Sequence, residues 1–168
     1  MNQKAEKFAE MLKKLPDDNV FETREIEDDG GHLVLFQSSL EAKKDLFVPL
    51  GVFIDDSMFT VVRVAAMLDA VNDGNRARVR DFLAEMNRLY KFKHYENDDG
   101  DILIDAAIPA DVEHFDPEAV AIVIDMVWGA VVVSLVLFLM LIHRKKYIVL
   151  GGVFPGQFLL QGECVVLG

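Results

Sequence analysis

The apolar run from Ala119 to Ile142 constrains this chain more than any other feature of its sequence. Asp116 and Pro117 precede it and fit the N-cap and the first position of a helix. A helix that is apolar on all faces must be buried all round or lie in a membrane. A bilayer span needs about 20 apolar residues, whereas the stretch after Asp125, up to Ile142, has only 17.

Two interpretations of this run follow from the residues alone. In the first, 116–130 is the last helix of a domain, and the remainder to Gly168 packs as extra apolar structure or into a partner subunit. In the second, 119–142 is a membrane span. Because the basic cluster after it, His143-Arg144-Lys145-Lys146, would stay cytosolic, the preceding domain would have to cross the membrane without a signal peptide. We therefore predict a domain over 1–130 and a C-terminal extension of uncertain role over 131–168.

The charge is concentrated before the apolar run. Residues 1–118 hold 14 Lys+Arg against 26 Asp+Glu, a net charge of −12, and the whole chain carries −11. This excludes sequence-independent binding to nucleic acid, which needs basic side chains to displace phosphate counterions, and it repels anionic lipid. Basic partners, and partners bound through apolar contacts, remain compatible with it.

Cys164 is the only cysteine, and the first 15 residues lack the apolar core of a signal peptide. A reducing, cytoplasmic location is therefore expected, with membrane association as the alternative.

Hydrophobic periodicity predicts the order α-β-β-β-β-α-β-β-α. Apolar residues at helical spacing indicate helices over 2–15 and 76–90, and the third helix is the one that begins at Asp116. Alternating or β-branched segments indicate strands over 20–27, 32–38, 46–54, 59–67, 92–96 and 101–108. Asp28-Asp29-Gly30-Gly31 and Asn97-Asp98-Asp99-Gly100 are typical of hairpin turns. The fold class is therefore α+β, an antiparallel sheet with helices packed on one side.

No motif in the sequence indicates catalysis, a cofactor or a metal. An EF-hand alignment on Gly100 would place Tyr95 at the first ligand position and Ala106 at the last, and neither side chain binds calcium. His32, His94, His114 and His143 lack the spacing of a zinc site. The glycines lack the pattern of a phosphate-binding loop, and Cys164 is interpreted as an inert apolar residue. We expect no enzyme, with a small enzyme of unfamiliar type as the alternative.

One segment resembles a known family. Phe82-Leu83-Ala84-Glu85-Met86-Asn87, the turn at Asp99-Gly100-Asp101, the strand ending at Ile108-Pro109, and Phe115-Asp116-Pro117-Glu118 resemble the YbjN family of bacterial sensory transduction regulators. The resemblance covers roughly residues 5–130, and its specific motifs lie within 82–118. This chain departs from the family pattern at its C-terminus. The family's last helix is amphipathic, whereas the last helix expected here is almost wholly apolar beyond Asp125. In a third interpretation of the apolar run, the C-terminal tail of this chain is not the natural ending of the family, for instance because of a reading-frame change.

The resemblance implies a fold like that of type III secretion chaperones, often dimeric, with no cofactor. It implies a non-enzymatic protein-binding module, a regulator or chaperone that presents an apolar sheet face or groove to an unknown partner protein. A domain anchored in the membrane by 119–142 is the alternative. The expected face for self-association or partner binding is on the second helix: Val79, Phe82, Leu83, Met86, Leu89 and Tyr90. Asn87 matches the asparagine of the family pattern, and we expect it to help turn the chain out of that helix.

Overall fold

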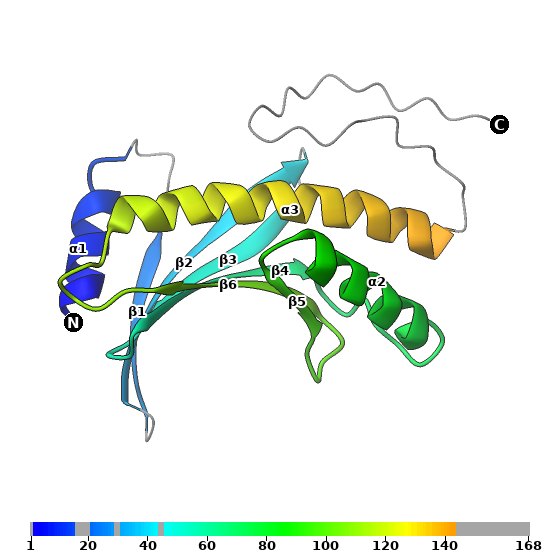
Figure 1. Cartoon of the computed structure of the whole chain (residues 1–168), viewed down its shortest axis with the longest axis horizontal. Coiled ribbons are helices and arrows are strands. Elements are labelled where there is room, and N and C mark those ends of the chain that lie inside the picture. The colour runs from blue at the N-terminus through cyan, green and yellow to red at the C-terminus, as the bar shows by residue number, and fades with distance from the viewer. Residues whose placement is uncertain (1, 16–20, 29–30, 44–45, 144–168) are drawn as a thin grey trace.

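The structure, a computed structural model, describes residues 2–15, 21–28, 31–43 and 46–143. It confirms the α+β class and the predicted order of elements (Figure 1). The helices are α1 (Gln3–Leu12), α2 (Arg76–Leu89) and α3 (Pro117–His143). The strands are β1 (Glu22–Asp28), β2 (Gly31–Lys43), β3 (Leu46–Ile54), β4 (Phe59–Met67), β5 (Lys93–Glu96) and β6 (Ile102–Pro109).

The six strands form one sheet in the order β1-β2-β3-β4-β6-β5, and every neighbouring pair is antiparallel. The chain leaves the sheet after β4, forms α2, and returns through the β5–β6 hairpin. Because β6 pairs with β4, this hairpin places β5 at the edge. The structure thus ends the sheet on two edge strands, β1 and β5.

Strict alternation in the central strands decides which face is covered. In β4 the even-numbered residues from Thr60 to Ala66 are buried and the odd-numbered residues are not. The same pattern holds in β3 from Val48 onward and in most of β6. Since successive side chains of a strand point to opposite faces, one face of the sheet supplies the core.

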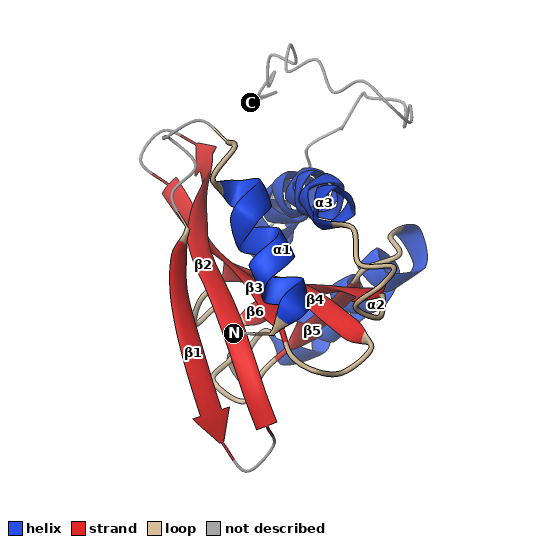
Figure 2. Ribbon diagram, turned by 90° about the vertical axis from the view of Figure 1, so that its left-hand side faces the viewer, coloured by secondary structure: helices blue, strands red, loops and turns tan. Residues whose placement is uncertain are grey.

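All three helices lie on the covered face (Figures 1 and 2). The ring of Phe8 on α1 is fully buried and packs edge-on against Phe36 of β2, with ring centroids 5.0 Å apart. Helix α3 crosses β4 and β6 and also contacts α1. Helix α2 packs at the β5 end, where Val79 and Leu83 join Ile102 of β6 in a second apolar cluster.

Helix α3 is longer than the sequence predicts. Its start is as expected, because Asp116 accepts a hydrogen bond from the backbone N–H of Glu118 at 2.9 Å and Pro117 opens the helix. The helix then continues past residue 130, and Val131, Ser134 and Phe138 are all buried. The expected end of the last helix at 130 is therefore wrong, because α3 runs to His143.

The turn between β5 and β6 depends on glycine. Gly100 has φ +81, and a Cβ at this position would lie 2.6 Å from the backbone oxygen of Val71. The same glycine accepts hydrogen bonds through its carbonyl from the N–H groups of Ala70 and Val71. The turn therefore joins the hairpin to the segment that leads into α2.

Candidate functional site: the open face of the sheet

The face of the sheet opposite the helices is covered by no described helix (Figure 2). Antiparallel sheets with one solvated face normally carry polar residues there. Here the central strands carry apolar ones instead. By register, the apolar side chains of described residues on this open face are Ile26, Leu33, Leu35, Phe47, Pro49, Phe53, Phe59, Val61, Ala65, Leu103, Ala107 and Pro109. Phe47 is 59 % exposed and Phe59 is 51 % exposed.

An ion pair lies at the centre of the open face. Arg63 on β4 faces Asp105 on β6, and its Nε and Nη2 each donate to a carboxylate oxygen at 2.8 Å. This two-bond geometry fixes the guanidinium in one orientation. The hydrogen bond to Asp105 raises the pKa of Arg63 above its ordinary value. The hydroxyl of Tyr95 on β5 donates to Asp105 as well, at 3.1 Å.

Aromatic rings extend this pair on both sides. The guanidinium carbon of Arg63 lies 5.1 Å from the ring centroid of Phe53, and the ammonium of Lys93 lies 4.5 Å from that of Tyr95. The ring of Phe53 lies over Gly51, where a Cβ would come within 2.8 Å of the ring. Glycine therefore lets the ring lie flat on the sheet. The result is a row of side chains that runs across β3, β4, β6 and β5.

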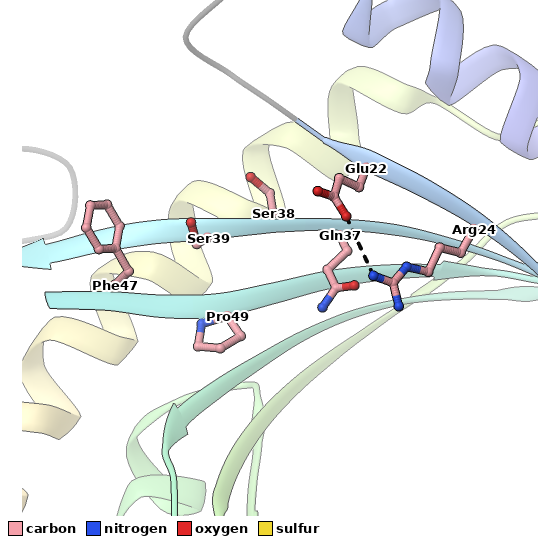
Figure 3. A pocket seen from close by; sticks show the side chains of 7 residues that line it. All are labelled: Glu22, Arg24, Gln37, Ser38, Ser39, Phe47 and Pro49. Atoms are coloured by element: carbon pink, nitrogen blue, oxygen red, sulfur yellow. Dashed lines mark ion pairs between the residues drawn. The ribbon is translucent and has the colours of Figure 1, made fainter.

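A shallow pocket lies near the β1 edge (Figure 3). Its volume is about 410 Å³, and its lining comes from three strands: Glu22, Arg24, Gln37, Ser38, Ser39, Phe47 and Pro49. Arg24 and Glu22 form an ion pair of 3.6 Å between exposed side chains. Pro49 lies just before the first residue of β3 that pairs with β4, a position that suits a residue without a backbone N–H. The pocket thus combines an apolar ring with polar groups.

The six residues of the predicted partner face of α2 differ in their exposure. Val79, Leu83 and Met86 are buried inside the domain, so they do not form a surface. Phe82 and Tyr90 are half-buried, and Phe82 packs at 5.9 Å from the ring of Phe138 on α3. Among the six residues, Leu89 alone is largely exposed. As drawn from the sequence, this face is mainly intramolecular core.

Asn87 ties the end of α2 to β5. Its side-chain oxygen accepts from the backbone N–H of His94 at 2.7 Å, and its amide nitrogen donates to the carbonyl of His94 at 3.0 Å. These bonds imitate a strand pairing and hold the chain where it leaves the helix. His94 is itself buried, and this burial lowers its pKa below the ordinary value.

The other candidates from the sequence lie apart. Asn97 holds the turn before β6, accepting through its side-chain oxygen from the N–H groups of Asp99 and Asp101. His32 contacts Glu25 and His114 contacts Asp111, on different parts of the fold. Within the described ranges, no three His, Cys, Asp or Glu side chains gather as a metal site would require. Asp29, Gly30 and Cys164 lie outside the described residues.

Helix α3 is long and apolar enough to cross a membrane over Pro117–Phe138, and 28 % of its most apolar 18-residue window is buried in the domain. Length and composition alone are weak evidence for a span.

Comparisons of the chain with protein-family models, with curated proteins and with solved structures find no match. The description that the structure supports is therefore that of its fold. This is an α+β protein whose antiparallel sheet has one face covered by helices and one face open.

The residues of the open face were missed as a site by sequence reasoning. A signal was present only in part, because both faces of β3 and β4 are largely apolar in the sequence and Arg63 is the one charged residue in these two strands. The sequence also gives no register between β4 and β6. Without the register, Arg63 and Asp105, 42 residues apart, have no reason to be paired.

Proposed function

We propose that this protein binds another protein through the open face of its sheet, as a non-enzymatic regulator or chaperone-like module. The observation that carries the proposal is the apolar content of that face. Contiguous exposed apolar surface on a soluble protein commonly indicates an interaction site. Phe47 and Phe59 contribute large side chains that the domain itself leaves more than half exposed.

The side chains of Arg63, Asp105 and Tyr95 give the open face polar groups in fixed orientations. Because Arg63, Asp105 and Tyr95 hold each other in place, their orientation costs little entropy when a partner binds. Aromatic and arginine side chains are also enriched at the energetic centres of interfaces. The face therefore offers apolar contact area together with fixed polar groups that select a partner.

The acidic charge favours a partner with basic groups. The net charge of −12 on residues 1–118 attracts such a partner at long range and raises its association rate at low salt. Apolar contacts on the open face then supply most of the affinity. The resemblance of residues 82–118 to the YbjN family, with its implied chaperone-like fold, agrees with this proposal.

The test compares the intact protein with surface variants in affinity purification from its native host. Phe47→Ser and Phe59→Ser change the open face at exposed positions, so they leave the fold intact. Leu89→Ser, an equally exposed position on α2, is the matched control. We expect a bound protein that the control retains and the two open-face variants lose. Equal retention by all variants, with unchanged circular dichroism and melting temperature, would contradict the proposal.

A membrane-anchored domain is the second candidate, because α3 is apolar over 22 residues and mostly unburied. Its inner face argues for the soluble form. Val120, Val127 and Val131 are fully buried in the main core, so insertion into a bilayer would remove the helix from the sheet.

A further inference from the structure

The outer face of α3 carries an apolar stripe that no described element covers. Its residues are Ile122, Met126, Gly129, Val133 and Val136. The steps between them are four, three, four and three residues, the spacing of a seam between two packed helices. Ile122, Met126 and Val136 are 60 %, 57 % and 43 % exposed.

The stripe is distinct from the face that packs on the sheet. The buried residues Val120, Val127, Val131 and Phe138 lie on the opposite side of the helix at about 100° per residue. Helix α3 therefore has two largely apolar faces, of which the domain uses one. The exposed carboxylate of Asp125 lies at the margin of the outer face, beside Ile122 and Gly129.

Gly129 lies at the centre of the stripe. A Cβ at this position would meet no atom of the described residues within 4 Å, so packing within the described part of the chain does not require glycine there. In a helix interior, glycine costs about 1 kcal/mol relative to alanine. At a contact between helices, in contrast, it lets two backbones approach closely.

The stripe is nearly symmetric about Gly129. Ile122 lies seven residues before it and Val136 seven residues after it, while Met126 and Val133 lie three before and four after. A two-fold interface needs a surface that complements itself. Antiparallel pairing centred on Gly129 would place Ile122 of each copy beside Val136 of the other.

The ends of the helix carry opposite charges. Asp116 and Glu118 are exposed at the N-terminal end, and Arg144, Lys145 and Lys146 follow the C-terminal end in the sequence. Antiparallel pairing places the N-terminal end of each α3 beside the C-terminal end of the other, which opposes the helix dipoles favourably. Parallel pairing would bring the acidic side chains of Asp116 and Glu118 of the two copies together.

We propose that two copies of this chain associate through the outer face of α3, antiparallel and centred on Gly129. This interface differs from the α2 face that the sequence suggests. Because α3 and the open face lie on opposite sides of the sheet, the dimer leaves both open faces free for partners. The seam covers only two heptads, fewer than the three or four that specify a coiled coil alone, so we expect a dissociation constant of about micromolar.

Sedimentation velocity on the full chain, from about 1 to about 100 µM, measures the association. We expect a mass that rises from 18.9 kDa toward twice that value. Met126→Lys should weaken the dimer at least about tenfold, since it buries a charge in the seam. Leu68→Lys, at an exposed position outside α3, should leave it unchanged. A monomer at every concentration overturns the proposal, as does equal weakening by both variants or sedimentation only as a complex with lipid or detergent.

Cysteine cross-linking in a Cys164→Ser background tests the orientation. The Gly129→Cys variant should form a disulfide-linked dimer on mild oxidation, because the two-fold axis passes through this position. Neither Ile122→Cys nor Val136→Cys should cross-link alone, but a mixture of the two should. Efficient cross-linking of Ile122→Cys by itself would indicate parallel pairing and overturn the antiparallel arrangement. Loss of partner binding by the open-face variants is measured separately, so either proposal can fail without the other.

Discussion

At the scale of single residues, a few positions hold parts of the fold that the sequence pattern does not connect. Gly100 lets the β5–β6 turn reach the backbone of Val71. The backbone of His94 is held by Asn87 at the end of α2, and its buried Nε2 atom has no hydrogen-bond partner among the described residues. Each of these positions gives a measurable prediction.

Gly100→Ala should lower the free energy of unfolding by about 3 kcal/mol, because it adds backbone strain and a contact with the oxygen of Val71. Urea denaturation measures this loss. Gly31→Ala is the control, since Gly31 also has a positive φ (+118) but nothing lies within 4 Å of its added Cβ. Equal losses in the two variants would show that the contact with Val71 is unimportant.

His94 should make the protein less stable in weak acid. Burial lowers its folded-state pKa below the ordinary value of 6.5, so between these two pKa values the unfolded chain binds more protons. The free energy of unfolding is therefore unaffected by His94 above about pH 6.5, and it falls as the pH drops toward the folded-state pKa.

Urea denaturation from pH 8 to pH 5 tests this dependence. The His94→Gln variant should lose part of the slope that the wild type shows below about pH 6.5. The His114→Gln variant, at an exposed position, should keep the part of the slope that His94→Gln loses. A His94→Gln variant with the wild-type slope would contradict the assignment.

At the scale of elements, the second helix and most of the strands were predicted closely, and the ends of β2 and of the last helix were not. β3 and β4 have the predicted bounds because each is a continuous apolar or β-branched segment flanked by turn residues. β2 continues to Lys43, beyond the predicted end at 38. Its Ser38 and Ser39 lower the apolar signal, but pairing with β3 continues past them. The end of α3 was missed because an all-apolar run contains no periodic signal from which to read a boundary.

The part of α3 beyond residue 130 should be necessary for stability. Phe138→Ala should cost about 3 to 5 kcal/mol, since its ring is buried between α2 and the sheet. Leu68→Ala, at an exposed position, should change the free energy of unfolding by less than about 0.5 kcal/mol. Chemical denaturation of both variants measures the difference. A loss as small as that of the control would show that the packing of α3 beyond residue 130 contributes little to stability.

At the scale of the whole molecule, the acidic charge and the apolar helix have opposite implications. The charge of −11 keeps the surface hydrated, whereas the helix favours burial or a bilayer. The fold reconciles them by placing one face of α3 on the sheet. The other face then needs a second partner, which the proposed dimer provides.

The full-length protein, expressed without a tag, should therefore be recovered in the soluble fraction after cell lysis. The physical reason is that the inner face of α3 is already buried in the domain core. Ultracentrifugation, a carbonate wash and immunoblotting measure the distribution. Recovery in a carbonate-resistant pellet that only detergent releases would favour the anchored alternative.

The sequence by itself determined the fold class, the order of the elements and the presence of one long apolar helix. These depend on local periodicity, turn residues and caps, which act over a few neighbouring positions. Only the tertiary structure decided that Arg63 meets Asp105, that Val79 and Met86 of α2 are core, and that α3 has an inner and an outer face. Those facts depend on strand register and on which helix covers which face, and both are set by contacts between residues far apart in the chain.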